Sequence, residues 1–366
     1  MLQRRIFQST RMRIATIKDV AKRAGVSLQT VSRVANNEPS VLAATKARVQ
    51  QAIDELHYTP DLSARSLRKA KTYAVGLVYD NPNSHYIISA QNGALAACRE
   101  LGFGLQIHPC NATSPRLIDE LLDLVRRLRL AGLVLAQPLS SDADLIRVLS
   151  EHEIPLVRII SANADPEDGY PCVYVDDRGA TYDIVEHLIR LGHHRIGFLW
   201  GGRQHQSSSE RFRGYVDALR DYSVGLEEAL IIPGDFSFDA GFRGARKLLA
   251  LSEPPTAIFG SNDEIAAGVL NAARSLRMEV PHDLSVAGFE DSPFSRQSWP
   301  ALTTARQATE DLVAHATKLL IAQLDDNRHE KVSNRGFRPE LVVRSSTAPP
   351  RFGPDPTPSR EAAGVT

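Results

Sequence analysis

The residues from Ser27 to Asn36 combine glutamine, arginine and hydroxyl side chains in a way that suits nucleic-acid chemistry. Gln29 can pair with the edge of adenine, and Leu28 can contact the methyl group of thymine. Arg33, one helical turn later, can reach guanine or a phosphate. Hydroxyl and amide side chains nearby suit phosphate oxygens, which fix position without distinguishing bases. The residues with this expected backbone role are Thr16, Ser27, Thr30, Ser32 and Asn36.

Three short helices must position these side chains. Thr16 with Asp19 is a capping-box variant that begins the first helix, Gly25 ends it, and Ser27 caps the second. Each helix has an apolar stripe, formed by Ile17, Val20, Ala21 and Ala24, by Val31 and Val34, and by Val49, Ile53 and Leu56. Helices separated by one tight turn predict a helix-turn-helix unit, whose second helix enters a major groove.

The charge distribution also favours a nucleic-acid-binding role for the head. The chain has 43 basic and 43 acidic side chains and therefore no formal net charge. Residues 1–71 nevertheless hold fourteen Lys and Arg against five Asp and Glu, so the remainder is acidic by the same margin. A basic head on an acidic body is typical of an anion-binding module attached to a second function, although a solvated basic face is the simpler alternative.

The segments "ATIKDVAKRAGVSLQTVSRVANN" and "ARVQQAIDELHYTPDLSARSLR" resemble the DNA-binding head of the lactose-repressor family over some 55 residues. The resemblance implies a helix-turn-helix domain at 15–60 that binds double-stranded operator DNA. Leu42 departs from the family pattern, which usually has a serine cap for the third helix. We therefore expect that helix either to start later, at Thr45, or to be weakly capped.

In the same family, the segment matching residues 61–71 is a hinge helix that forms on operator DNA. The resemblance places Ala64, Leu67 and Arg68 against DNA, with Leu67 as the side chain that wedges open a base step in the minor groove. The alternative is an ordinary linker in which Leu67 packs on the body.

From Tyr73 onward, short β-rich apolar runs alternate with helical periods, which predicts parallel sheets with helices on both faces. The expected fold class is a small all-α helix-turn-helix head plus an α/β body of two parallel-sheet lobes. The body resembles a type I periplasmic binding protein. We expect it to span residues 72–347, with a first lobe at about 72–172 and 302–330 and a second at about 173–301 and 331–347. Residues 1–14 are expected to be a disordered basic arm, unless translation starts at Met12, and residues 348–366 a disordered tail.

Ligands in such folds lie beyond the carboxyl ends of the strands, so residues just after strands are the effector-binding candidates. In the second lobe, Phe236 and Arg211 match the family's stacking aromatic and ligand-binding arginine. The alternatives are a core phenylalanine and a surface ion pair. Asn262 follows a strand and either binds ligand or caps the next helix. Glu290 stands where the family usually has an aspartate, so either the pocket differs in shape or Asp291 takes that role.

The first lobe contributes a second set of candidates. Asp80, Asn81, Tyr86 and Ile87 all follow the first strand, and Tyr86 and Ile87 match family pocket positions. Arg158 lies near the end of a strand and either points into the cleft or forms an ion pair within the body. A buried arginine needs an anionic partner or ligand because burying an unpaired charge is costly.

Several other functions are disfavoured. The cysteines Cys98, Cys110 and Cys172 have no paired or metal-like spacing, which suits a reducing, cytoplasmic setting. His187, His193 and His194 lack the spacing and the further ligands of a metal site, so neither a metal nor a cofactor is expected. The motifs of common hydrolases and nucleotide-binding enzymes are absent. A solute receptor would need an export signal, and no apolar run approaches the roughly 18 residues of a membrane span.

The sequence thus predicts a dimeric, ligand-controlled transcription regulator, most simply a repressor of carbohydrate-utilisation genes. The expected partners are a palindromic operator, a second copy of the chain and a small effector. The candidate side chains favour a sugar over a purine, and they do not decide between an inducer and a co-repressor. The tail lacks the apolar heptads of a tetramerising coil, which favours a dimer.

Overall fold

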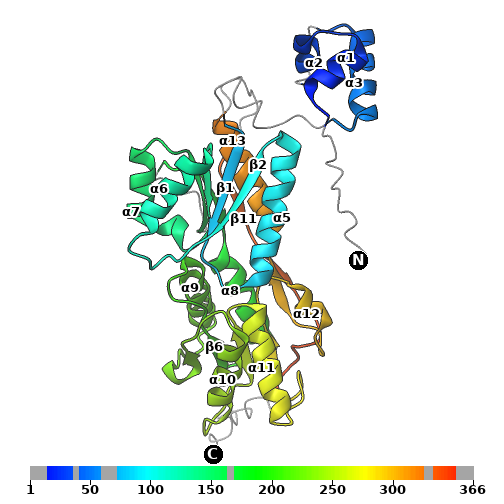
Figure 1. Cartoon of the computed structure of the whole chain (residues 1–366). Helices are drawn as coiled ribbons and strands as arrows, with labels where there is room; N and C mark the ends of the chain where they lie inside the picture. Colours follow the sequence, from blue (N-terminus) through cyan, green and yellow to red (C-terminus); the bar gives the residue numbers. More distant parts are fainter. Residues whose placement is uncertain (1–14, 36–40, 59–71, 163–168, 325–332, 352–366) are drawn as a thin grey trace, which may run out of the picture. The chain divides into compact units, whose positions relative to one another are not determined.

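The computed structural model describes residues 15–35, 41–58, 72–162, 169–324 and 333–351 (Figure 1). The chain divides into two compact units between Thr72 and Tyr73. The first unit contains the helix-turn-helix head and the second contains the α/β body. This division lies within one residue of the predicted start of the body.

The described part of the head contains three helices, α1 (Ile17–Ala24), α2 (Leu28–Ala35) and α3 (Ala43–Glu55). The carboxylate of Asp19 accepts hydrogen bonds from the backbone N (2.9 Å) and Oγ1 (2.7 Å) of Thr16, which confirms the start of α1. Gly25 ends α1 with a φ of 64°, in the left-handed region that glycine adopts without steric cost.

The predicted apolar stripes meet in one small core. Val20, Val31 and Val49, one from each helix, are completely buried, and the shorter alanines fill the space between them. Leu42 occupies the N-cap position of α3 without a side-chain hydrogen bond. The weakly capped alternative is therefore the observed one, and the helix does not start at Thr45.

The first lobe of the body contains a six-stranded parallel sheet in the order β11-β5-β4-β3-β1-β2. Its strands are β1 (Ala74–Tyr79), β2 (Gly104–Pro109), β3 (Leu133–Leu135), β4 (Leu156–Ser161), β5 (Cys172–Val175) and β11 (Arg335–Phe337). The central strands are buried on both faces, as expected for a parallel sheet with helices on both sides.

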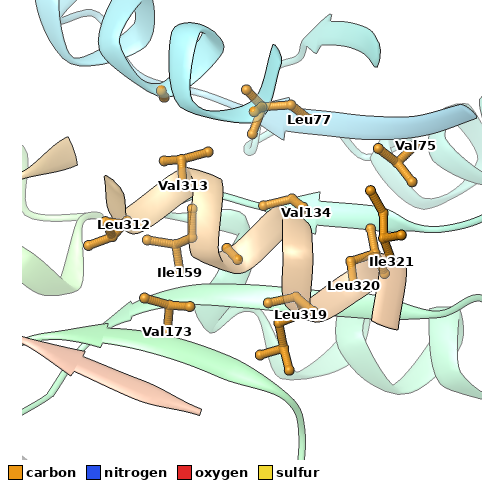
Figure 2. Packing of buried hydrophobic residues seen from close by; sticks show 14 of the residues in the cluster. Val75, Leu77, Val134, Ile159, Val173, Leu312, Val313, Leu319, Leu320 and Ile321 are labelled. Atoms are coloured by element: carbon orange, nitrogen blue, oxygen red, sulfur yellow. The ribbon is translucent and has the colours of Figure 1, made fainter. Parts of the chain in front are cut away.

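Helices cover both faces of this sheet. One face carries α5 (Ser84–Leu101) and α13 (Thr309–Gln323), and the other carries α6 (Leu117–Leu128) and α7 (Ala143–Glu151). Figure 2 shows Val313 and Leu319 of α13 among the sheet side chains Leu77, Val134 and Ile159. Gly93 lets α5 approach α13 closely, because a Cβ there would lie 2.1 Å from the carbonyl oxygen of Glu310.

The second lobe contains a four-stranded parallel sheet in the order β7-β6-β8-β9. Its strands are β6 (Ile196–Leu199), β7 (Ile231–Ile232), β8 (Ala257–Gly260) and β9 (Ser285–Ala287). Helices α8 (Asp177–Arg190) and α9 (Gln206–Asp221) cover one face, and α10 (Phe238–Leu249) and α11 (Asp263–Ser275) cover the other. The remaining elements are α12 (Pro293–Gln297), the antiparallel pair β10 (Thr304–Arg306) and β12 (Glu340–Val342), and the short 3-10 helices η1 (Leu139–Ser141) and η2 (Glu228–Leu230).

The chain crosses between the lobes later than the sequence predicted at all three boundaries. Strand β5 pairs with β4, so the first crossing follows Val175 and not residue 172. Ala305 packs in the second lobe, so the next crossing follows Arg306 and not residue 301. Strand β11 pairs with β5, so the last crossing follows Phe337 and not residue 330. These short strands were missed because a few apolar residues beside a turn carry little periodicity.

The predicted start of the tail at residue 348 is also too early. The carbonyl oxygen of Ala348 accepts a hydrogen bond from Ser285 Oγ (3.0 Å), and Arg351 donates to Asp283 (2.8 Å). Residues 348–351 therefore belong to the second lobe. Among the residues that the structure describes, no helix is both long enough and apolar enough to cross a membrane, and no cluster of side chains has the makings of a metal site.

Candidate functional site

The outer face of α2 carries the side chains predicted to contact bases. Leu28 is 38% exposed, and Gln29 and Arg33 are also exposed, whereas Val31 and Val34 point into the head core. Helical spacing thus separates the packing residues from the polar ones. This arrangement leaves the amino-terminal end of α2 accessible to a base edge, as a recognition helix requires.

The hydroxyl groups at the helix ends already have partners within the head. Ser27 Oγ accepts a hydrogen bond from Thr30 N (3.1 Å) and lies 2.9 Å from Thr30 Oγ1. This cap fixes the start of α2, in the same way that Thr16 and Asp19 fix the start of α1. The predicted phosphate contacts of these hydroxyls would therefore use their remaining hydrogen-bonding capacity.

The three helices of the head carry six exposed cations. They are Lys18, Lys22, Arg23, Arg33, Lys46 and Arg48. Arg23 pairs with Glu55 (2.5 Å). Ser32 on α2 is half-buried. The remaining predicted DNA contacts lie outside the described residues; they are Asn36, Ala64, Leu67 and Arg68. All roles in DNA binding stay predictions at this point.

The body contains an interlobe cavity at the carboxyl ends of the strands of both sheets. Polar side chains of the two lobes face each other there, as the topology of parallel sheets predicts. The residues that line it are Asn81, Asn83, Tyr86, Gln137, Ile159, Ile160, Val175, Asp177, His205, Ser207, Arg211, Phe236, Glu290 and Gln307.

A buried ion pair forms the base of the interlobe cavity. Arg211 Nε donates to Asp177 Oδ1 (2.8 Å), and Arg211 Nη1 donates to the carbonyl oxygen of Ser261 (2.5 Å). The other carboxylate oxygen of Asp177 accepts from Ser161 Oγ (2.5 Å), and the guanidinium lies 3.8 Å above the ring of Phe289. These contacts hold the guanidinium plane in one orientation, so its remaining N–H groups are preorganised for a ligand oxygen.

Glu290 faces this ion pair from a strained backbone position. Its φ of 112° lies in a region that non-glycine residues rarely adopt. The backbone N of Glu290 donates to Ala305 O (2.8 Å), and its Oε2 accepts from Asn83 Nδ2 (2.6 Å). Burial raises the pKa of Glu290 to about 8, and Asp263 adds to the increase while Arg211 opposes it. The raised pKa favours the protonated carboxyl near neutral pH, and this form can donate a hydrogen bond as well as accept one.

Asp263 fixes the loop that carries Glu290. Its Oδ2 accepts from Ser292 N (2.7 Å), and its Oδ1 accepts from Thr304 Oγ1 (2.6 Å). Burial raises the pKa of Asp263 to about 6, against the effect of these hydrogen bonds. Asp263 does not line the interlobe cavity, so it acts through the position of the loop.

Phe236 gives the cavity an apolar wall. The ring of His205 packs edge-on against it, with 5.2 Å between the ring centroids. Gly201 permits this packing, because a Cβ there would lie 2.2 Å from Cε1 of Phe236. Burial lowers the pKa of His205 to about 4, so its imidazole is neutral at physiological pH. The wall can therefore pack against the apolar face of a ring without adding charge.

Hydrogen bonds join the two lobes at the cavity. Asn83 of the first lobe binds Glu290 of the second, as described above, and Ser207 N donates to Gln137 Oε1 (3.0 Å). A further interlobe hydrogen bond, from Ser141 Oγ to Gln206 Oε1 (3.0 Å), involves residues that do not line the cavity. A ligand that enters must compete with these contacts or reinforce them, and either effect changes the relation between the lobes.

Comparison with known proteins identifies both units. Residues 16–61 match the family model "Bacterial regulatory proteins, lacI family", and residues 185–347 match "Periplasmic binding protein-like domain". The chain is 33% identical over 342 residues to the "Probable HTH-type transcriptional repressor ExuR" of Bacillus subtilis (strain 168), covering 91% of this chain and 98% of that relative. It is 32% identical to the HTH-type transcriptional repressor CytR of Escherichia coli (strain K12), covering 91% of this chain and 96% of that one. The chain belongs to the lacI family.

Solved structures agree with this assignment. The lac repressor dimer bound to operator and the anti-inducer ONPF superposes with a TM-score of 0.75 at 26% identity, covering 92% of this chain and all of the other. The transcriptional regulator CelR in complex with cellobiose gives a TM-score of 0.67 at 28% identity, covering 91% and 99%. This lacI-family chain is thus a DNA-binding transcriptional repressor, and its relatives are regulators and not enzymes.

Five of the nine predicted effector-binding residues line the cavity of this lacI-family body, and four do not. The five are Asn81, Tyr86, Arg211, Phe236 and Glu290. Asp80 Oδ2 accepts from Ala112 N (2.8 Å), and Asn262 Oδ1 caps α11 at Ile265 N (2.9 Å). Ile87 is buried in its own lobe, and Arg158 lies with its guanidinium 5.3 Å from the centre of the Tyr170 ring. The capping alternative for Asn262 is therefore the correct one.

The sequence analysis missed several residues of the cavity. Each of these residues follows a strand: Gln137 follows β3, Asp177 follows β5, and His205 and Ser207 follow β6. Because ligands lie beyond the carboxyl ends of strands, these positions could have been predicted from the sequence as well. Asn83 looks like a helix cap in the sequence, and it is one, since its Oδ1 accepts from Tyr86 N (3.1 Å). Its second contact, with Glu290, depends on tertiary structure alone.

Proposed function

We propose that this repressor binds a palindromic operator as a homodimer and that a sugar in the interlobe cavity controls its affinity for the operator. The observation that carries the proposal is the lining of the cavity. It combines a fixed guanidinium at Arg211, the buried carboxyl of Glu290 and the apolar ring of Phe236. A sugar presents hydroxyl edges and an apolar ring face, so it can use all three.

Two of the similar structures support parts of this proposal. One is a complex of the regulator CelR with cellobiose, and another is a lac repressor dimer on its operator. The head of this chain exposes Gln29 and Arg33 on α2, in keeping with base contacts. Two heads related by a two-fold axis would then bind the two halves of a palindrome.

Exposed apolar side chains on the body support self-association. Trp299 is 96% exposed, and Ile88 on α5 and Phe294 on α12 are also exposed. Both helices lie on the right-hand side of the body in Figure 1. Large exposed apolar side chains favour a protein interface. Sedimentation at micromolar concentration should give a dimer, and a tetramer would contradict the proposal.

The proposed hinge helix can be tested through Leu67. Leu67→Ala should weaken binding to the specific site and leave non-specific binding nearly unchanged, because only the kinked site uses the wedge. Equal losses at specific and random DNA would refute the wedge.

A purine that acts as a co-repressor is the second candidate, because the flat ring of Phe236 also suits a base. Selecting binding sites from genomic DNA fragments at a fixed salt concentration tests the whole proposal. We expect a palindrome, whose affinity then changes when a sugar is added. A response to purines and to no sugar would favour the second candidate. Failure to enrich any site, with and without these ligands, would overturn both.

A further inference from the structure

The first lobe has a basic edge at the point where the chain enters it. All strands of its sheet are parallel, so their amino ends lie at one edge, and β1 begins there at Ala74. Tyr73 O accepts a hydrogen bond from Gly104 N (2.7 Å), and Ala74 O accepts one from Ala131 N (2.7 Å). Gly104 follows α5 and Ala131 follows α6, so the carboxyl ends of these two helices flank the point where the chain enters the body.

Four arginines at these helix ends form a surface that we name the basic-edge arginines. They are Arg99, Arg126, Arg127 and Arg129. All four side chains are exposed, and none has an ion pair or hydrogen bond with another described residue. Glu100 beside them is compensated by Lys318 (2.7 Å), and Asp123 is the one acid in residues 121–130. This edge therefore concentrates positive charge on a body whose net charge is negative.

Arg129 has a backbone conformation that suits glycine. It follows the last residue of α6 with a φ of 50° and a ψ of 52°, in the left-handed region. After α5 the same position is filled by Gly102, with a φ of 73°, where no side chain is strained. Residues in such conformations cluster at functional sites, where the side chain offsets the strain. We therefore expect the side chain of Arg129 to have a partner outside the described part of the chain.

Phosphate groups of DNA are the partner that this surface fits. An arginine guanidinium binds phosphate oxygens through two parallel N–H donors. The DNA-binding head is joined to the body at this edge, so a bound duplex is tethered to the point that the basic-edge arginines flank. Arginines in the last turn of a helix also interact favourably with its dipole, but Arg129 lies beyond that turn.

We propose that the basic-edge arginines bind backbone phosphates of the DNA that the head holds. The body then adds contacts that do not depend on base sequence to the base contacts of the head. These contacts raise the affinity for every DNA site without changing the preference among bases. An acidic protein is the other occupant that the charge allows, and its binding would leave the affinity for purified DNA unaffected.

The salt dependence of DNA binding by the full-length protein tests the proposal. The probes are the operator recovered by site selection and a duplex of random sequence and equal length. The first variant combines Arg126→Gln, Arg127→Gln and Arg129→Gln. It should bind both probes at least about five-fold more weakly at about 0.1 M salt, and the slope of log affinity against log salt should fall by about 0.9 for each lost contact.

A second variant with the same loss of charge is the matched control. It combines Arg243→Gln, Arg246→Gln and Lys247→Gln on the exposed face of α10, in the second lobe, and should keep the wild-type affinity and slope. Equal losses in the two variants would indicate an effect of net charge alone and overturn the inference. Wild-type slopes in the first variant would overturn it too, and would leave an acidic protein as the occupant.

Directed cleavage of DNA locates the contact independently of affinity. Arg127→Cys labelled with an iron–EDTA group should cut the operator backbone at discrete positions at saturating protein concentration. Arg246→Cys with the same label should give no such cuts, because position 246 lies in the second lobe, and the native cysteines are common to both proteins. Absence of cuts from position 127 in the saturated complex would overturn the inference.

Discussion

The head and the interlobe cavity bring their candidate functional side chains together in opposite ways. On α2 the candidate base contacts Leu28 and Gln29 are neighbours in the sequence, and both are exposed. In the cavity Asn83 and Glu290 are 207 positions apart, yet their side chains are 2.6 Å apart. Local sequence thus determines the first surface, whereas the second exists only when two lobes fold and meet.

The two regions also differ in whether their charged side chains are exposed or buried. The head displays cations to solvent, where they are available to phosphates and sensitive to salt. The cavity buries its charges and compensates them within the protein, as Arg211 and Asp177 show. Substitutions in the cavity should therefore affect stability and ligand response, and substitutions on α2 should affect DNA preference alone.

The largest expected effect is that of Arg211→Ala. It removes the guanidinium that we propose binds the ligand, and it leaves the carboxylate of Asp177 buried without its main partner. The ligand response should disappear, and the free energy of unfolding of the body should fall by about 3–5 kcal/mol. Titration with effector and urea unfolding measure the two effects, while operator affinity in ligand-free, folded protein should stay near that of the wild type.

Arg178→Ala is a matched control for this substitution. Arg178 donates to Asp217 (2.6 Å), but its side chain is partly exposed, so its loss should cost no more than about 1 kcal/mol. If Arg211→Ala kept its ligand response, Arg211 would be a structural residue, and the contrast between cavity and head would lose its main support.

The second prediction concerns pH. The pKa of Glu290 rises from 4.5 to about 8 on folding, so the folded state holds a proton that the unfolded state releases. This contribution to stability is complete below pH 4.5 and is lost as the pH rises toward 8, by up to about 1.4 kcal/mol per pH unit. Urea unfolding of the body between these limits should show the decline.

Glu290→Gln separates this effect from other titrations. Glutamine keeps an acceptor for Asn83 but has no proton to lose, so the decline with pH should become shallower. Glu279→Gln, at an exposed position outside the interlobe cavity, should leave the wild-type slope unchanged. Identical slopes for the wild type and Glu290→Gln would show that Glu290 is ionised in the folded protein.

The contrast between the regions also explains what the sequence could predict. Caps, glycine and helical stripes located α1 and α2, because these signals lie within a few residues of the structure that they determine. Five cavity residues were found from strand ends and family resemblance. The lobe crossings at Val175 and Phe337 and the contact of Asn83 with Glu290 were not predicted, because they depend on strand pairing and on contacts between distant segments.

The third prediction sharpens the role of the head. Gln29→Ala should change the preference for one base pair in each half of the operator by about 1–3 kcal/mol, because a base contact discriminates at one position. Binding to a library of single-base operator variants measures this. Gln51→Ala, an exposed glutamine on α3, should leave the preference unchanged. A uniform loss across the library for Gln29→Ala would make Gln29 a phosphate contact.

The smallest expected effect lies at the weak cap of α3. Leu42 is 80% exposed and supplies no side-chain acceptor for the first turn, so a backbone N–H there lacks the partner that a serine would give. Leu42→Ser should stabilise the head by about 1 kcal/mol, which slows hydrogen exchange of the α3 amides about five-fold in the full chain. Leu42→Ala removes the same apolar side chain without adding an acceptor and should give no such protection. Equal exchange in the two variants would mean that α3 is stabilised by its packing on Val20 and Val31 alone, and that even in the head a local signal can be outweighed by the core.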